Sequence, residues 1–170
     1  MLGSKITRKI INLGPLILLY YLSVSEIDSH FENYFEILSF NIQLIIIYFW
    51  SLKRPEVLGN GHIFFAGLIN DVVVGLPLGL SSMTYLITSL VAAYVKNMTV
   101  NTRITTDWFT FFIAITFSNL LLLILLTNFS EITISFIDMS YNTFFTLIFF
   151  PFFWFLFVYY NSIIASGKNV

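Results

Sequence analysis

The sequence predicts an all-α membrane protein in which about six transmembrane helices form one bundle. The chain is 58% hydrophobic and only 10% charged, and its mean hydropathy is +0.87. A soluble domain of 170 residues needs many more polar residues to cover its surface. The lengths of the apolar runs and the positions of the basic residues indicate the same fold class.

Apolar runs close to the length of a membrane span occur six times along the chain. A helix needs about 20 apolar residues to cross the hydrocarbon core of a bilayer. The runs lie near Ile10 to Val24, Phe35 to Leu52, His62 to Leu76, Leu80 to Val95, Trp108 to Phe129 and Tyr141 to Ile164. The third and fourth runs are short and are joined by residues 75–79, so two spans, one broken helix and a re-entrant pair all remain open.

The basic residues assign an orientation to these runs. All Lys and Arg residues fall in alternate connections, and most acidic residues fall in the others. Because positive charge stays on the cytoplasmic side, the pattern predicts cytoplasmic N- and C-termini. No composition shift divides the chain, which predicts a single integral membrane domain over residues 1–170. Aromatic side chains near the predicted cytoplasmic helix ends are expected at the membrane–water interface; they are Trp50, Tyr94, Trp108, Tyr159 and Tyr160.

Composition and motif content argue against an enzyme and against a nucleic-acid-binding protein. The net charge of −1 provides no basic surface for nucleic acid. The absence of cysteine excludes thiolate metal sites and a cysteine nucleophile. His30 and His62 fall on opposite sides of the predicted membrane and cannot share a metal ion, and no nucleotide-binding glycine motif is present. The sequence therefore predicts no enzymatic activity, no cofactor and no metal, with the lipid bilayer and other proteins as partners.

Asp71 is the acid that lies deepest inside an apolar run. It follows His62 by about 14 Å of helix, which places it near the middle of the hydrocarbon core. Gly67 and Gly75 lie four residues to either side of Asp71, and Gly79 continues the spacing. Small residues at this spacing let a neighbouring helix approach closely. A charge at this depth is costly, so we expect Asp71 to face protein.

Three roles for Asp71 follow from this position: a hydrogen-bonding clamp, a contact to a partner helix, or a proton or ion relay. The clamp is favoured, because a relay needs a chain of ionisable groups and none is visible. No Lys or Arg lies at a similar depth, so Asp71 is either protonated or bonded to polar side chains. The candidate donors are Asn41, Gln43, Ser118, Asn119 and Thr146.

The tripeptide Arg54-Pro55-Glu56 follows the second apolar run directly. Pro55 is expected to stop the helix and to favour an extended conformation at Arg54. The simpler interpretation is a topological anchor with a stiff turn, and the alternative is a docking point for a cytoplasmic partner.

These segments resemble a known family. Trp50-Ser-Leu-Lys-Arg-Pro-Glu, Phe65-Ala-Gly-Leu-Ile-Asn-Asp and Gly75-Leu-Pro-Leu-Gly-Leu-Ser are similar to the central signature of the bacterial rod shape-determining MreD family. The resemblance is carried by Trp50 to about Val95. The matched residues, which the resemblance marks as partner-binding or structural, are Arg54, Pro55, Glu56, Gly67, Asp71, Gly75, Pro77 and Gly79.

The resemblance implies a non-enzymatic scaffold or regulatory subunit of the cell-wall elongation machinery in the bacterial inner membrane. Such a subunit maintains rod shape by binding MreC and linking MreB filaments to peptidoglycan synthesis, with RodZ, RodA and a penicillin-binding transpeptidase in the same complex. It also implies a fold like the six-helix substrate-binding subunits of energy-coupling-factor transporters.

Two other function classes remain alternatives to a scaffold subunit. A substrate-binding subunit of a vitamin or small-molecule transporter is the main alternative, although the first apolar run lacks the alanines expected for docking a coupling subunit. A small membrane enzyme would need an ionisable cluster at one membrane face. The acidic connection from Glu26 to Glu36 is the only candidate for such a cluster.

Overall fold

The computed structural model contains six α-helices and no strand within the residues that it describes, which are 2–25, 40–98, 103–129 and 136–166. The helices are α1 (Leu2–Val24), α2 (Ile42–Lys53), α3 (Asn60–Val74), α4 (Leu80–Met98), α5 (Ile104–Phe129) and α6 (Phe136–Ser166). The all-α prediction is confirmed. The acidic connection Glu26 to Glu36, with His30, and also Glu131 and Lys168 lie outside the described residues.

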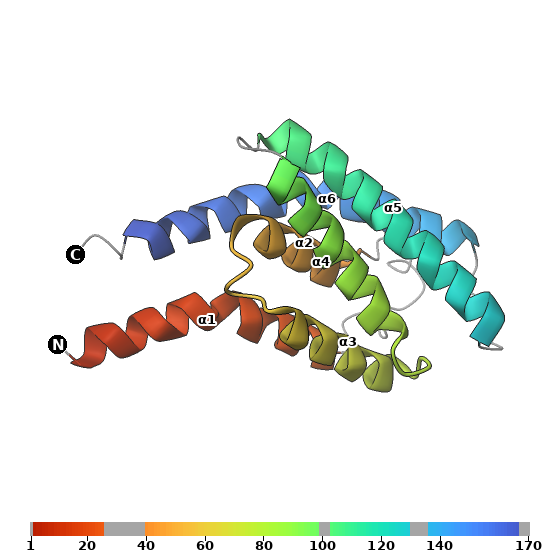
Figure 1. Cartoon of the computed structure of the whole chain (residues 1–170), viewed down its shortest axis with the longest axis horizontal. Helices are drawn as coiled ribbons and strands as arrows, with labels where there is room; N and C mark the ends of the chain where they lie inside the picture. The colour runs from red at the N-terminus through yellow and green to blue at the C-terminus, as the bar shows by residue number, and fades with distance from the viewer. Residues whose placement is uncertain (1, 26–39, 99–102, 130–135, 167–170) are drawn as a thin grey trace.

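The helices lie roughly side by side in one bundle (Figure 1). The start of α1 and the end of α6 lie at the same end of the bundle, and the α3–α4 turn lies at the opposite end. We call these the termini end and the hairpin end. Helices α3 and α4 are separate helices packed against each other, which excludes one broken helix for this region.

Several helices extend beyond the apolar runs that predicted them. Helix α1 begins at Leu2, inside the basic N-terminal stretch, and α5 begins at Ile104, upstream of Trp108. Hydropathy marks the part of a helix that suits a bilayer, whereas backbone hydrogen bonding continues into polar flanks. Helices α2 and α3 have 12 and 15 residues, about 18 and 22 Å at 1.5 Å per residue, which is shorter than a hydrocarbon core of about 30 Å.

Helix α2 is the centre of the core. Every residue from 44 to 52 is buried, and Tyr48 packs against the stacked rings of Phe111 and Phe150, whose centroids are 4.3 Å apart. Trp50 is only 1% exposed, so its expected place at the membrane–water interface is wrong. The helix is enclosed by neighbours on all sides, and this burial outweighs the position of Trp50 near a helix end.

Helices α5 and α6 are the two in the described chain that are long and apolar enough to cross a membrane. Both expose large apolar side chains, such as Phe117 on α5 and Phe155 on α6. The apolar stretches within α1, α2 and α3 are shorter. The count of six spans and the cytoplasmic termini therefore stay predictions.

Candidate functional site: the α3–α4 clamp and the polar pocket beside it

Asp71 is fully buried and joins the end of α3 to the start of α4. Its carboxylate accepts backbone hydrogen bonds from Gly79 N at 2.7 Å and from Ser81 N at 2.8 Å. Its carbonyl oxygen accepts from the backbone N–H of Gly75 and of Leu76, which ends α3. The side chain thus satisfies amides that the first turn of a helix leaves without partners, and its charge lies at the positive end of the α4 dipole.

The predicted donors to Asp71 are wrong. The two donors are backbone amides of the α3–α4 connection, and the candidate side chains have other partners: Ser118 Oγ lies 2.8 Å from Thr88 Oγ1, and Asn119 donates to Thr143. Asp71 also lies in the last turn of a short helix and not in the middle of a long one. A short connection brings the amides of the next helix directly onto the carboxylate, so no distant side chain is needed.

The glycine stripe of α3 is a close-packing site only at Gly67. A Cβ atom at Gly67 would overlap the Cα of Ser82 and lie 2.5 Å from its backbone nitrogen. Ser82 also donates from its hydroxyl to the carbonyl of Phe64 at 2.9 Å. Helices α3 and α4 are therefore in backbone contact here, as small residues permit.

Gly75 and Gly79 serve the turn and not the packing, so the interpretation of Gly75 as a close-approach residue is wrong. They have φ angles of +74° and +100°, and a Cβ on either would meet no atom within 4 Å. Positive φ is what these positions require, and glycine adopts it without a steric penalty. Pro77 lies between them, and its carbonyl accepts from Leu80 N at 3.3 Å.

Arg54, Pro55 and Glu56 belong to the α2–α3 connection, which lies toward the termini end of the bundle (Figure 1) and at the opposite end of α3 from Asp71. Arg54 ends α2 with φ −147° and ψ 73°, so it leaves the α region that proline disfavours but falls short of the extended ψ of about 120–160°. Its guanidinium Nε lies 3.4 Å from the Glu56 carboxylate, which is 65% exposed. The structure thus divides the matched signature between the two ends of the bundle.

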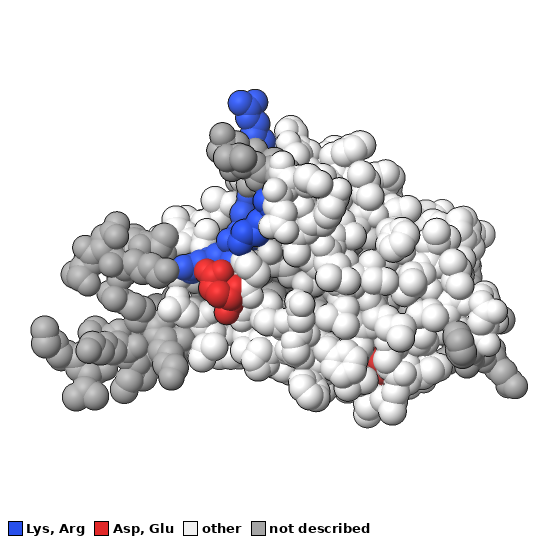
Figure 2. Space-filling view, viewed as in Figure 1, with Lys and Arg blue, Asp and Glu red and all other residues white. Residues whose placement is uncertain are grey.

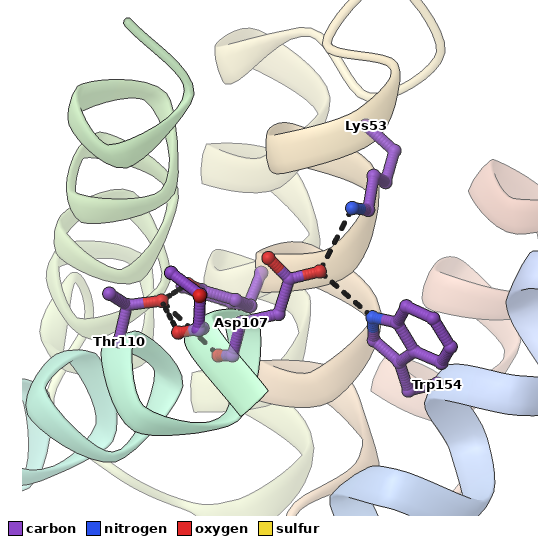
Figure 3. Close-up of polar contacts among 6 residues, drawn as sticks. Lys53, Asp107, Thr110 and Trp154 are labelled. Carbon is purple, nitrogen blue, oxygen red and sulfur yellow. Dashed lines mark hydrogen bonds and ion pairs between the residues drawn. The ribbon is translucent and has the colours of Figure 1, made fainter. Parts of the chain in front are cut away.

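A second buried acid, Asp107, lies in the first turn of α5 (Figure 3). Its Oδ2 is 2.9 Å from Lys53 Nζ on α2 and accepts a hydrogen bond of 2.9 Å from Trp154 Nε1 on α6. The ammonium also lies 5.9 Å from the centroid of the Trp154 ring. Asp107 is 0% exposed, and its Oδ1 has no partner in the described chain. This buried ion pair ties three helices together, and removing one partner from such a pair is strongly destabilising.

The predicted fifth span begins at Trp108, so it left Asp107 outside the membrane segment and gave no sign of its burial. One signal was available: Lys53 and Asp107 both flank predicted spans at the same membrane face, and an acid commonly occupies the first turn of a helix. Hydropathy alone does not show that these two flanks meet.

A polar pocket of about 300 Å³ lies beside the Asp71 clamp, with its lining drawn from α2 to α6. Its polar lining comprises Asn41, Gln43, Asn70, Ser81, Thr84, Tyr85, Asn119, Asp138 and Asn142. Five of these side chains are carboxamides, and they come from four separate stretches of the chain: Asn41 with Gln43, then Asn70, Asn119 and Asn142. Three of the proposed donors to Asp71, namely Asn41, Gln43 and Asn119, therefore meet in this pocket instead.

Hydrogen bonds connect the pocket wall to the clamp. Gln43 donates to the carbonyl of Leu22 at 3.2 Å and to Asn70 Oδ1 at 3.4 Å. Asn70 in turn donates to Ser81 Oγ at 3.1 Å, and the backbone N–H of Ser81 is held by Asp71. The acid therefore fixes the start of α4, which supplies one wall of the pocket.

The pocket has the chemistry of a recognition site. Carboxamides and hydroxyls donate and accept hydrogen bonds without undergoing protonation at ordinary pH. No group of three or more His, Cys, Asp or Glu residues suited to a metal ion occurs among the described residues.

A model of the rod shape-determining protein MreD matches residues 7–164 of the chain. The chain belongs to the MreD family. The MreD match spans the clamp, the pocket and the Lys53–Asp107 pair, well beyond the segments that carried the resemblance. MreD proteins determine rod shape in the membrane and are not a known enzyme family. The comparisons with curated proteins and with solved structures gave no match. Nothing in these comparisons supports the transporter alternative.

Proposed function

We propose that the chain is a non-enzymatic subunit of the cell-wall elongation machinery that binds MreC. The match to the MreD family over residues 7–164 is the observation that carries this proposal. Through MreC the subunit would link MreB filaments to peptidoglycan synthesis, in a complex with RodZ, RodA and a penicillin-binding transpeptidase. The signature residues at the hairpin end, Gly67, Asp71, Gly75, Pro77 and Gly79, act in this proposal as the frame of the binding surface.

We place the chain in the bacterial inner membrane as a multi-pass protein with both termini cytoplasmic. Figure 2 supports this orientation, because the visible Lys and Arg side chains gather toward the termini end and most of the remaining surface is uncharged. The described basic residues outside α1 are Lys53, Arg54, Lys96 and Arg103. The pocket, at the opposite end, then faces the outer side, where a bitopic partner exposes its main domain.

The polar pocket is our candidate contact surface for MreC. A peptide segment carries an N–H and a C=O on nearly every residue, and both can pair with carboxamide side chains. The pocket is open and preformed, so a partner segment would enter without rearranging the bundle. The Arg54-Pro55-Glu56 turn at the other end remains the candidate docking point for a cytoplasmic component.

Co-purification of MreC from native membranes tests the proposal. Leu122→Trp on α5 would fill the pocket, which Leu122 lines. Ile124→Trp, on the exposed surface of the same helix, is the matched control. We expect MreC to be recovered with the wild type and the control but to be reduced with Leu122→Trp.

Two results would contradict different parts of the proposal. Absence of MreC and of other wall-elongation proteins from the wild-type preparation would refute the scaffold role. Full recovery of MreC with Leu122→Trp would leave the scaffold role in place but remove the pocket from the interface.

A further inference from the structure

An apolar groove of about 420 Å³ lies between α5 and α6, on the exposed side of both helices. Its lining runs from Phe112 to Leu123 on α5 and from Phe136 to Leu147 on α6. Each stretch is about 16 Å long at 1.5 Å per residue, which is half of a hydrocarbon core of about 30 Å. The groove therefore has the length of one leaflet of a bilayer.

The groove offers an occupant neither a charge nor a free hydroxyl proton. Its lining contains no Lys, Arg, Asp or Glu. Its three hydroxyl groups, on Thr116, Ser140 and Thr143, each donate at 2.8 Å to the carbonyl four residues earlier in the same helix. A transmembrane partner helix associates through small residues and interhelical hydrogen bonds, and it would extend past a groove of this length. A hydrocarbon chain needs neither the hydrogen bonds nor the full span, so it suits the groove better.

The groove is continuous with the polar pocket. Asn119 and Met139 line both of them. Asn119 Nδ2 donates to Thr143 Oγ1 at 2.7 Å, so this amide bridges α5 and α6 where groove and pocket meet. A single molecule can therefore occupy both, with an apolar part in the groove and a polar part in the pocket.

The polar pocket offers both donors and acceptors. Asn41 Oδ1 accepts from Leu44 N at 3.1 Å, while its Nδ2 has no acceptor among the described residues. Asn119 uses one of its two amide protons, and within the described chain nothing donates to Asn119 Oδ1 or to Gln43 Oε1. A hydroxyl group both donates and accepts, so a head with several hydroxyl groups can pair with both kinds of atom. The lining has no basic residue and includes the exposed Asp138, which disfavours an anionic phosphate.

We infer that the groove and the polar pocket together bind one lipid with an uncharged, hydroxyl-rich headgroup, such as a glycosyl diacylglycerol. One acyl chain lies in the groove between α5 and α6, and the headgroup enters the pocket past Asn119. The pocket volume of about 300 Å³ is at the lower end of the range for small-molecule sites. This lipid site goes beyond the proposed function, and the lipid and the MreC segment would be alternative occupants of the polar pocket.

Native mass spectrometry of the purified full chain tests the site, in polyether detergent micelles that carry no sugar. The probes are a monoglucosyl diacylglycerol, a phosphatidylcholine and a phosphatidylglycerol with identical acyl chains, added in equal amounts. We expect the wild type to retain the glucosyl lipid at least about fivefold more than either phospholipid, as one or two additional hydrogen bonds provide. Leu120→Trp fills the groove and Leu122→Trp fills the pocket, so each should lower glucosyl-lipid retention to the level of the phospholipids. Ile124→Trp, on the exposed surface of the same helix, should retain it like the wild type.

Four results would overturn the lipid site. Equal retention of the three lipids would remove the headgroup from the pocket, and a preference for phosphatidylglycerol would mean that the head is anionic. Unchanged retention in Leu120→Trp or in Leu122→Trp would remove the lipid from the groove or from the pocket. A dimer of the chain that is lost in Leu120→Trp, with no lipid retained by the wild type, would make the groove an interface between two copies. The assay contains no MreC, so its failure would leave the proposed function in place.

Discussion

Replacing Asp71 with leucine removes the clamp between α3 and α4 and leaves two backbone amides without an acceptor. The bond to Ser81 N is buried, and the bond to Gly79 N is part-buried. A buried donor that loses its acceptor costs about 1–3 kcal/mol. Loss of the negative charge at the start of α4 adds about 0.3–1 kcal/mol. Since water can replace part of the Gly79 bond, we expect a loss of about 2–4 kcal/mol in the free energy of unfolding.

Asp71→Asn provides a graded comparison at the same position. Gly79 N and Ser81 N bond to different oxygens of the carboxylate, and an amide replaces one of these oxygens with an NH2 donor, so one of the two bonds is lost. We expect a loss of about 1–2 kcal/mol, intermediate between the wild type and the leucine variant.

Reversible unfolding in mixed detergent micelles, followed by tryptophan fluorescence, measures both variants. Asp138→Leu is the control, because it removes an exposed acid at the same end of the bundle and should change stability by less than about 0.5 kcal/mol. A loss below about 0.5 kcal/mol for Asp71→Leu, or an equal loss for Asp138→Leu, would refute the clamp. If stability falls as expected, co-purification with MreC should fall with it, because Asp71 holds the helix that forms one pocket wall.

Three further predictions concern the packing, the buried ion pair and the topology. Gly67→Leu should cost at least about 1–3 kcal/mol by overpacking against the backbone of Ser82, whereas Gly61→Ala, with no atom in the way, should leave the thermal midpoint unchanged or raised; equal effects would contradict the backbone contact. Lys53→Met should cost about 3–5 kcal/mol because Asp107 is left buried without its cation, and adding Asp107→Asn should restore part of that loss in the same unfolding assay; an additive loss would contradict the pairing. For the topology, single cysteines introduced at Ser29 and at Ser135 should be labelled from outside in intact cells, whereas a cysteine at Asn101 should not. Labelling at Asn101 would overturn the six-span topology.

Part of the site was predictable from local sequence. Asp71 stood out because a charge in an apolar run is rare, and its role as a clamp was among the predicted alternatives. Gly67 was marked as a close-packing residue by its small size and its four-residue spacing. Pro55 was expected to stop the second helix, and α2 ends at Lys53 with Arg54 outside the helical conformation.

The partners of these residues were not predictable in the same way. The donors to Asp71 are backbone amides, and every residue has one, so composition provides no signal for them. Gly75 has the same spacing as Gly67 but serves a positive φ angle, which depends on where α3 ends. Trp50 lies near a helix end like the exposed Tyr94, yet the surrounding helices bury it.

The sequence by itself determined the membrane class, the all-α fold, six helices in the described chain and the family. These properties depend on hydropathy, on the length of the apolar runs and on local motifs. Each of these can be read from neighbouring residues in the sequence, without knowing which helices pack together. Only the tertiary structure decided that Asp107 pairs with Lys53 and that carboxamides from positions 41 to 142 meet in one pocket. Both depend on which faces of distant helices pack together, and that choice is made by the shape and burial of the whole bundle.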